Sequence, residues 1–507
     1  MSGVSIPFDH LVVLHSHWRP GGVRRVVELA LPSIVRALSP WLRKVTLLSG
    51  GKSHERLILP PLGVETVFHI DPAFDYLPAG YFEAGKFSER IKKTLEGVVS
   101  GGDPSRVLVW FHNPALAKNP LVCAEVGALS RRADVGLLMH HHDFWCAGRW
   151  ERWETLQACG FDTPASAAAV LFGAGARCRH VTINSIDFKT LAPSFLGMAD
   201  HLPNPLVQKV PDSNTRSSAA RAWINEKTGG RPLWISPTRL LRRKNLLEGI
   251  ILARWLRPDA VFAIASGAFS SGERRYARIL NEVAKESDGR VIIGLLDDPD
   301  SPEVEQVLSL AEAVILTSVQ EGFGMGFVEA AVAGVPVIAR RLPHVKPDME
   351  ALGFMFPHLY DEVLIAPDLF DRKAEAVRQS VAIKKNQAGL RIFNLQAIPA
   401  CGNAIAGAVP FSRLTVEGQR EVMRHPADKS WSLCKELNPW LVQIASSPLK
   451  ATPWPQGLEG SIEHYATSFV EIVQSMPTQG FSGKSEAAQF AIARAALNPG
   501  EYFPLLI

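Results

Sequence analysis

The sequence has few cysteines and no long apolar run, and both absences narrow its class. Its 507 residues include six cysteines, and no two of them form a Cys-x-x-Cys pair. We therefore expect neither a disulfide framework nor a structural zinc site, and scattered thiols of this kind are typical of a cytoplasmic protein. The most apolar segments, ASAAAVLFGAGA and AAVAGVPVIA, are far shorter than a membrane span. No charged region precedes the first apolar stretch, so we expect no signal peptide.

The charge is not concentrated either. A formal net charge of +4 suits an anionic ligand such as a nucleotide. A nucleic-acid partner is not expected, because such proteins usually carry dense basic stripes. The length exceeds that of one ordinary core and predicts two domains with extensions.

Short apolar runs alternate with helical patterns along most of the chain. Continuous apolar strands separated by helices predict parallel sheets covered on both faces. We therefore expect an α/β fold with two doubly wound, Rossmann-like domains facing a cleft, and ligands at the carboxyl ends of the strands. The expected parts are residues 1–205, a Pro- and Ser-rich linker at 206–230, residues 231–365, and a helical extension at 366–507, part of which crosses back to the first domain.

A glycine-rich segment at 317–339, TSVQEGFGMGFVEAAVAGVPVIA, is the strongest signal. Its glycines allow the backbone to approach a ligand, and the N-terminus of the following helix favours negative charge. Glu321 and Glu329 are eight residues apart and can face one ligand from different heights. Paired carboxylate acceptors suit sugar hydroxyls. The alternative is a tight strand–helix turn with two solvated glutamates.

A basic cluster follows an earlier strand, in SPTRLLRRKNLLEGIILA at 236–253. Arg239 and Lys244 lie on either side of the turn before a helix, and they can offer two positive charges to a diphosphate. The alternative is a solvated helix start. However, basic residues are unfavourable at a helix N-terminus unless an anion is nearby.

These segments together resemble a known family. RLLRRKNL followed by EGFGMGFVE is similar to the retaining GT-B glycosyltransferases of family 4, whose hallmark is a Glu-x7-Glu motif. PGGVRRVVELA, HLPNPLV and two C-terminal helical segments also resemble that family, so the resemblance covers most of residues 8–476. It implies an N-terminal acceptor domain and a C-terminal domain for the nucleotide-sugar donor.

The resemblance also implies roles for single residues. Glu321 would face the donor sugar, Glu329 would bind the ribose, and Arg239 and Lys244 would neutralise the diphosphate. Backbone groups would bind the sugar hydroxyls and the phosphates at Gly322, Phe323 and Gly324 and, in the other domain, at Gly21 and Gly22. Met325 and Gly326 stand where many members have Leu-Pro, which leaves the donor open.

The implied reaction needs neither a metal nor a cofactor. Two fixed cations and helix-end amides stabilise the negative charge that develops on the diphosphate. An Asp-x-Asp metal site is imitated by DDPD at 297–300, but these residues fall in a polar loop. In the resembled family the acceptor hydroxyl loses its proton to the departing phosphate, and no enzyme nucleophile is required.

The run HHHD at 140–143 invites a metal site, with Cys146 nearby. Successive strand side chains point to opposite faces, so three adjacent histidines cannot all ligate one ion. We therefore predict no metal here. The family resemblance instead implies that His142, or His141 as second choice, contacts the donor sugar, with Asp143 orienting the ring. A buried structural histidine is the alternative for each.

The segment WFHNPALAKNPLV at 110–122 follows the preceding strand. We expect it to line the acceptor side of the cleft, and a lysine there suits an anionic acceptor. A polar strand–helix loop is the alternative. The combination weakly resembles glycosyltransferases that make sugar-capped glycerate. The predicted acceptor-side residues are His112, Asn113, Lys118 and Asn119.

The sequence therefore predicts a cytoplasmic, metal-independent, retaining enzyme that moves a hexose from a GDP- or UDP-sugar to a small, potentially anionic hydroxyl acceptor. A lipid- or polysaccharide-directed enzyme at the membrane surface, a disaccharide phosphorylase, a sugar-nucleotide epimerase and a catalytically silent sugar-binding scaffold remain as alternatives. The donor, the acceptor and the oligomeric state are left open.

Overall fold

The computed structural model shows a chain that divides into two compact units. Unit 1 comprises Met1–Val207, Ala388–Ala397 and Gly460–Glu501, and unit 2 comprises Gln208–Gln387, Ile398–Glu459 and Tyr502–Ile507. The residues that the structure describes are 7–19, 21–52, 57–78, 80, 82–208, 218–268, 271–395, 407–458, 461–480, 483–496, 503 and 506.

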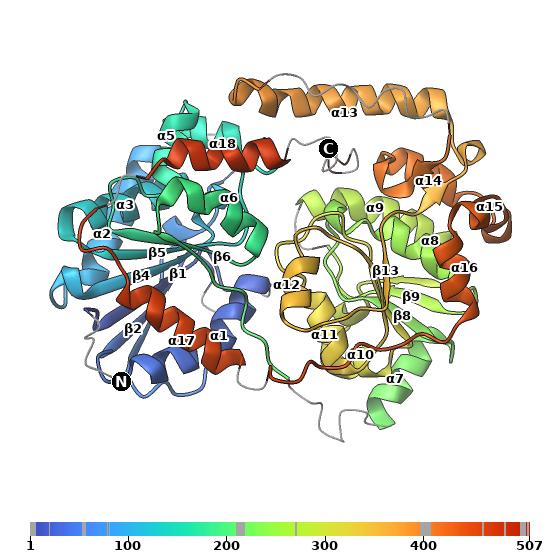
Figure 1. Cartoon of the computed structure of the whole chain (residues 1–507), viewed down its shortest axis with the longest axis horizontal. Coiled ribbons are helices and arrows are strands. Elements are labelled where there is room, and N and C mark those ends of the chain that lie inside the picture. Colours follow the sequence, from blue (N-terminus) through green and yellow to red (C-terminus); the bar gives the residue numbers. More distant parts are fainter. Residues whose placement is uncertain are drawn as a thin grey trace. The chain divides into compact units, whose positions relative to one another are not determined.

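Unit 1 contains a seven-stranded parallel sheet in the order β3-β2-β1-β4-β5-β6-β7 (Figure 1). All of its central strands are fully buried, as expected for a parallel sheet between helical layers. The strands are β1 (His10–Leu14), β2 (Lys44–Ser49), β3 (Glu65–Ile70), β4 (Val107–His112), β5 (Gly136–His141), β6 (Cys178–Thr182) and β7 (Ala199–His201).

Two helical layers cover this sheet, and strand parity divides its side chains between them. Leu11 and Val13 of β1 pack with α1 and α17, which lie alongside each other (Figure 1). Val12 and Leu14 pack into the opposite core with α2, α3, α5, α6 and α18. The helices are α1 (Gly22–Leu38), α2 (Ala84–Val99), α3 (Pro120–Ala133), α4 (Arg152–Ala158), α5 (Pro164–Leu171), α6 (Ser185–Phe195), α17 (Ser461–Gln474) and α18 (Ser485–Ala496).

Unit 2 contains a six-stranded parallel sheet in the order β10-β9-β8-β11-β12-β13, and a small antiparallel pair, β14-β15. The strands are β8 (Leu233–Ser236), β9 (Val261–Ile264), β10 (Val291–Ile293), β11 (Ala313–Leu316), β12 (Val337–Arg340), β13 (His358–Tyr360), β14 (Leu364–Ile365) and β15 (Val409–Pro410). The helices are α7 (Ser218–Thr228), α8 (Leu246–Leu256), α9 (Ser271–Lys285), α10 (Val304–Leu310), α11 (Met325–Ala333), α12 (Lys346–Ala351), α13 (Arg372–Ile392), α14 (Val416–Met423), α15 (Ala427–Cys434) and α16 (Pro439–Ser446).

The predicted α/β class with two Rossmann-like parallel sheets is confirmed. The sequence did not reveal β3, β7 and β13, because β3 is partly exposed at a sheet edge and the other two have three residues each. Residues 218–228 of the expected linker form α7, and residues 209–217 lie outside the described part. The C-terminal region is shared between the units, since α13 starts in unit 2 and ends in unit 1.

No helix in the described part of the chain is both long and apolar enough to span a bilayer.

Candidate active site

In unit 2 the glycine-rich segment forms the turn between β11 and α11. Gly324 precedes the helix with a φ of 95°. A Cβ on this residue would come within 2.6 Å of a methyl carbon of Val345, so both conformation and space require glycine. Phe323 is buried, whereas Gly322 is partly exposed. The turn therefore offers a ligand backbone groups rather than side chains.

Glu321, at the start of this turn, is the centre of a charged cluster. Its carboxylate accepts hydrogen bonds from the Lys244 ammonium, from Arg243 at 2.9 Å and from Ser318 Oγ at 2.6 Å. Burial favours the neutral carboxyl, but the two cations outweigh it and lower the pKa of Glu321 to about 2. The Glu321 side chain is 14% exposed, so an ionised carboxylate persists in a largely water-excluded place.

Glu329 belongs to the same electrostatic environment. It lies in α11, partly buried. Burial lowers the pKa of the Lys244 amine, and both Glu321 and Glu329 oppose that shift. The structure thus brings three of the predicted donor-site residues together at the carboxyl ends of β8 and β11.

Arg239, the other predicted diphosphate cation, is paired within the protein. Its guanidinium forms a 2.6 Å ion pair with Glu273 in the first turn of α9, and its side chain is 46% exposed. The second cation on Glu321 is instead Arg243, which precedes Lys244 in a 3-10 turn. The sequence argument chose Arg239 and Lys244 as the two cations and did not single out Arg243.

Buried polar groups fix the backbone that carries Lys244. The Thr317 hydroxyl donates to the carbonyl of Lys244 at 2.9 Å and lies 3.0 Å from that of Asn245. The backbone of Asn245 adopts the left-handed conformation, with a φ of 49°. Its side-chain amide donates to Glu248 at 2.8 Å and accepts from Gln419 at 2.9 Å. Lys244 is therefore presented from a rigid turn.

Glu248 continues this network into the core of unit 2. Its carboxylate accepts hydrogen bonds from Arg340 and from the Tyr360 hydroxyl, each at 2.5 Å, and Arg340 also pairs with Glu362 at 2.5 Å. Glu248 is completely buried, and this burial raises its pKa although Arg340 opposes the shift. Buried charges in unit 2 are thus held in pairs.

In unit 1 the two glycines of the first loop stand at the start of α1. Gly21 is its N-cap and Gly22 its first residue. Among the described residues, a Cβ on Gly22 would meet no atom within 4 Å, and one on Gly21 only a carbonyl oxygen at 4.0 Å. Packing within the protein therefore does not require glycine at either position, whereas a ligand close to the backbone would.

Strand parity separates the histidines at the end of β5. His141 turns into the core of α5 and α6, where its ring stacks with His180 and Nε2 lies 3.1 Å from that residue's Nδ1. Phe144 and Phe172 enclose it, and it has no exposed surface. The predicted contact of His141 with a donor sugar is therefore wrong, because its ring is part of the core.

His140 and His142 point to the other face, where His112 of β4 joins them. Nε2 of His142 lies 3.1 Å from Nδ1 of His112, and the ring of His140 stacks on that of His142. Only His142 retains some exposure, at 8%. Burial, and to a smaller extent His15, lower the pKa of His142 to about 3, although Asp143 opposes the shift. His142 is therefore a neutral ring near the surface.

His112 is buried, so it supports His142 rather than lining an open acceptor surface as predicted. Asp143 does not orient the His142 ring, because its carboxylate pairs with Arg149 at 2.6 Å.

The group His112, His140 and His142 also has the spacing of metal ligands, with ligating atoms within 4.8 Å of one another. The sequence argument covered three consecutive histidines and did not consider alternate residues joined by a neighbouring strand. Trp110 donates its indole N–H to Nδ1 of His140 at 3.1 Å, which places the proton of the neutral ring on Nε2. A protonated Nε2 has no lone pair for a metal, so only two of these rings are ready to ligate.

The loop after β4 carries the remaining predicted acceptor-side residues, Asn113, Lys118 and Asn119. Asn119 is buried, caps α3 through the N–H of Val122, and donates to the carbonyls of Ala73 and Asp75. The amide of Asn119 is thus engaged within the protein. Asn113, Lys118 and Asn119 all line a cavity of about 10 Å³.

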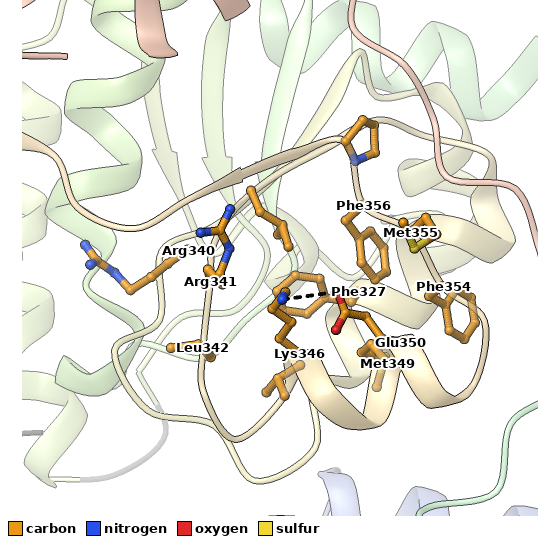
Figure 2. A pocket seen from close by; sticks show the side chains of 13 residues that line it. Phe327, Arg340, Arg341, Leu342, Lys346, Met349, Glu350, Phe354, Met355 and Phe356 are labelled. Atoms are coloured by element: carbon orange, nitrogen blue, oxygen red, sulfur yellow. Dashed lines mark ion pairs between the residues drawn. The ribbon is translucent and has the colours of Figure 1, made fainter. Parts of the chain in front are cut away.

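A larger cavity of about 200 Å³ lies beside α12 in unit 2. Figure 2 shows Arg340 and Arg341 on one side of it and three apolar side chains, Phe354, Met355 and Phe356, on the other. Arg341 is paired with Asp361 and Lys346 with Glu350, so the charges at its rim are already compensated. None of the predicted donor-site residues lines this cavity.

One family model matches part of the second unit. A family model described as glycosyl transferases group 1 matches residues 219–379. This segment contains Arg243, Lys244, Glu321 and Glu329, so the charged cluster lies within the part of the chain that the model matches.

Two curated proteins of Petrotoga mobilis are similar in sequence. A mannosylglucosyl-3-phosphoglycerate synthase is 24% identical over 349 residues, which cover 66% of this chain and 65% of that protein. A mannosylglucosylglycerate synthase is 25% identical over 270 residues, which cover 47% of this chain and 60% of that protein. The match thus spans less than two thirds of the length of either relative.

The fold has solved counterparts. An α,α-trehalose-phosphate synthase (UDP-forming) from Burkholderia xenovorans, solved with glucose-6-phosphate, superposes with a TM-score of 0.50 at 11% identity, covering 92% of this chain and 99% of that one. This likeness establishes a GT-B fold of two Rossmann-like units.

Proposed function

We propose that this chain, which carries a glycosyl transferases group 1 domain at residues 219–379, transfers a hexose from a GDP- or UDP-sugar to a small hydroxyl acceptor. The cluster around Glu321 carries the proposal. Lys244 and Arg243 supply two positive charges for a diphosphate, while Glu321 and Glu329 supply acceptors for sugar and ribose hydroxyls.

The donor replaces contacts that the free protein makes internally. Glu321 now accepts hydrogen bonds from both cations, and a bound diphosphate takes over part of that pairing. The carboxylate is then available to a sugar hydroxyl. As the bond between the anomeric carbon and the diphosphate breaks, the negative charge grows on an oxygen beside fixed cations and the amides of the turn before α11.

The acceptor oxygen then bonds to the anomeric carbon from the face that the diphosphate leaves, so the configuration is retained. The acceptor proton passes to the departing diphosphate, and no side chain has to act as nucleophile. The neutral ring of His142 forms a hydrogen bond with a hydroxyl of the transferred sugar, either as donor or as acceptor. Because two cations already face the diphosphate, we propose that transfer needs no metal ion.

The relatives support a small acceptor. The names of both Petrotoga proteins specify glycosylated glycerate compounds. A small acceptor of this kind is favoured over a lipid or a polysaccharide.

Calorimetry with GDP, UDP and ADP in the presence of a chelator tests the donor site. One nucleotide should bind, and Glu329→Ala should weaken its binding at least tenfold. Lys244→Met should lower kcat about 10²- to 10³-fold with a smaller change in KM, as for the loss of a group that stabilises transition-state charge. Lys346→Met, which removes an exposed lysine of the same unit, is the matched control.

Failure of all three nucleotides to bind would contradict the proposal. Restoration of activity only by a divalent cation after chelation would contradict metal independence alone.

A further inference from the structure

A second group of charges lies in unit 1, where the loops after β4 and β5 meet. Lys118 comes from the loop before α3, and Arg149 and Arg152 come from the turn before and the first residue of α4. Trp145 N–H donates to the carbonyl of Ala115, so the two loops are joined. Asp143 and Glu151 are the acidic neighbours of this group.

The two arginines differ in how many of their N–H groups have hydrogen-bond acceptors. Arg149 donates to Asp143 at 2.6 Å and to the carbonyl of Phe144 at 2.9 Å. Arg152 has one ion pair, at 3.4 Å, with the adjacent Glu151. Its Nε is buried and has no hydrogen-bond partner among the described residues. A buried N–H without an acceptor is unfavourable unless a ligand or a water supplies one.

Lys118 has no counter-charge in direct contact. Within the described part of the chain its amine forms neither a hydrogen bond nor an ion pair, and it lies 4.9 Å from the centre of the Tyr76 ring. The side chain is partly buried and lines the small cavity together with Asn113 and Ser16. An unpaired, partly desolvated ammonium is the arrangement that an anionic ligand would complete.

The charges around Lys118 agree with this description. Burial, together with the charges of Arg152 and Arg149, lowers the pKa of the Lys118 amine to about 8, although Glu151 and Asp143 oppose this shift. The amine is thus charged at pH 7 but is close to losing its proton.

We propose that Lys118 and the Arg152 guanidinium together bind a carboxylate or phosphate group of the acceptor, so that this protein selects acceptors by negative charge. The inference rests on the proposed function, since it names the acceptor class of that transfer. One oxyanion accepts hydrogen bonds from the ammonium and from Nε of Arg152 at once, and it supplies the missing negative charge. A neutral polyol of the same size supplies the acceptor oxygens but no charge.

Calorimetry at pH 7 without nucleotide tests the subsite with three probes: inorganic phosphate, glycerate and glycerol. Phosphate or glycerate should bind at least tenfold more tightly than glycerol, and the stronger of the two identifies the group. Lys118→Met and Arg152→Gln should each weaken anion binding at least tenfold. Lys86→Met, which removes an exposed lysine of α2 paired with Glu83, should leave it unchanged.

The pH dependence separates a binding role from a structural one. From pH 7 to 9 glycerate binding should weaken in the natural protein, because the Lys118 amine loses its proton through pH 8 while the carboxylate of the probe stays ionised. Lys118→Arg should bind the anion and lose this dependence, since a guanidinium stays charged.

Unchanged phosphate affinity in Lys118→Met, at an unchanged melting temperature, would overturn the inference. Equal affinity for glycerate and glycerol would do the same. If the anions bind through Lys118 but no nucleotide sugar is consumed, the anion subsite stands and the proposed transfer fails. If transfer to anionic acceptors is equally fast in Lys118→Met, the transfer stands and the subsite fails.

Discussion

Both units have polar side chains at the carboxyl ends of their strands, but these side chains differ in charge between the units. In unit 1 the buried titratable groups at the ends of β1, β4 and β5 are histidines, and burial keeps them neutral, as the lowered pKa of His142 shows. In unit 2 the buried groups are charged and paired, Glu321 with Lys244 and Glu248 with Arg340. Neutral rings suit hydroxyl groups, whereas fixed charges suit a diphosphate. This difference agrees with the proposed division, in which unit 1 contacts hydroxyl groups and unit 2 holds the diphosphate.

Mild acid should destabilise unit 1 more than unit 2. This is the largest effect that we expect. A histidine whose folded pKa lies below the ordinary 6.5 stabilises the fold fully above pH 6.5, and that contribution is lost as the pH falls, because the unfolded chain then binds the proton. Each such group removes up to about 1.4 kcal/mol per pH unit. The buried histidines with lowered pKa values in unit 1 are His10, His15, His112, His140, His141, His142 and His180.

Hydrogen–deuterium exchange at pH 7 and pH 5.5, corrected for intrinsic rates, measures this loss for each unit. Peptides from β4 and β5 should lose several kcal/mol of opening free energy, and peptides from β8 and β11 much less. An equal loss in both units would contradict the assignment of neutral histidines to unit 1.

Removal of one partner from the buried pair of unit 2 should have the next largest effect. Arg340→Ala leaves the Glu248 carboxylate buried with the Tyr360 hydroxyl and Asn245 but without its cation. We expect the free energy of unfolding in urea to fall by about 3–5 kcal/mol. The control is the adjacent residue, Arg341, which forms an exposed ion pair with Asp361. Arg341→Ala should lower the free energy of unfolding by less than about 1 kcal/mol. A similar small loss in both variants would show that the Glu248 pair is solvated.

Neutralising Glu321 should make Lys244 and Arg243 available to a different anion. Glu321→Gln weakens charge-assisted hydrogen bonds to Lys244 and Arg243 and should lower stability by about 1.5–3 kcal/mol. Inorganic diphosphate should then raise the melting temperature more in this variant than in the natural protein, because both cations are available to it. An identical shift in the two proteins would mean that the diphosphate binds elsewhere.

Much of this arrangement was predictable from the sequence, and the failures have physical causes. The alternation of apolar runs predicted both sheets, and the two motifs placed Glu321 and Lys244 directly after strands of the second domain. The same parity rule also decides His141, because Met139 two residues earlier faces the same core. What the pattern could not supply was the competition between neighbouring cations. Arg239 and Arg243 are four residues apart on one turn, and only the structure shows that the second contacts Glu321.

The smallest expected effect concerns the two glycine loops and sharpens the comparison between the units. Gly324 of unit 2 is left-handed and its Cβ position is occupied, so Gly324→Ala should lower stability by about 1–2 kcal/mol. Gly22 of unit 1 starts a helix in open space, and Gly22→Ala should change the free energy of unfolding by no more than about 0.5 kcal/mol. If Gly22 nevertheless serves to let a phosphate approach the backbone, the alanine variant will keep its urea midpoint and bind the nucleotide sugar less tightly. Unchanged affinity would leave Gly22 without a role in binding, and a large loss of stability would show that the start of α1 packs more tightly than its open surroundings indicate.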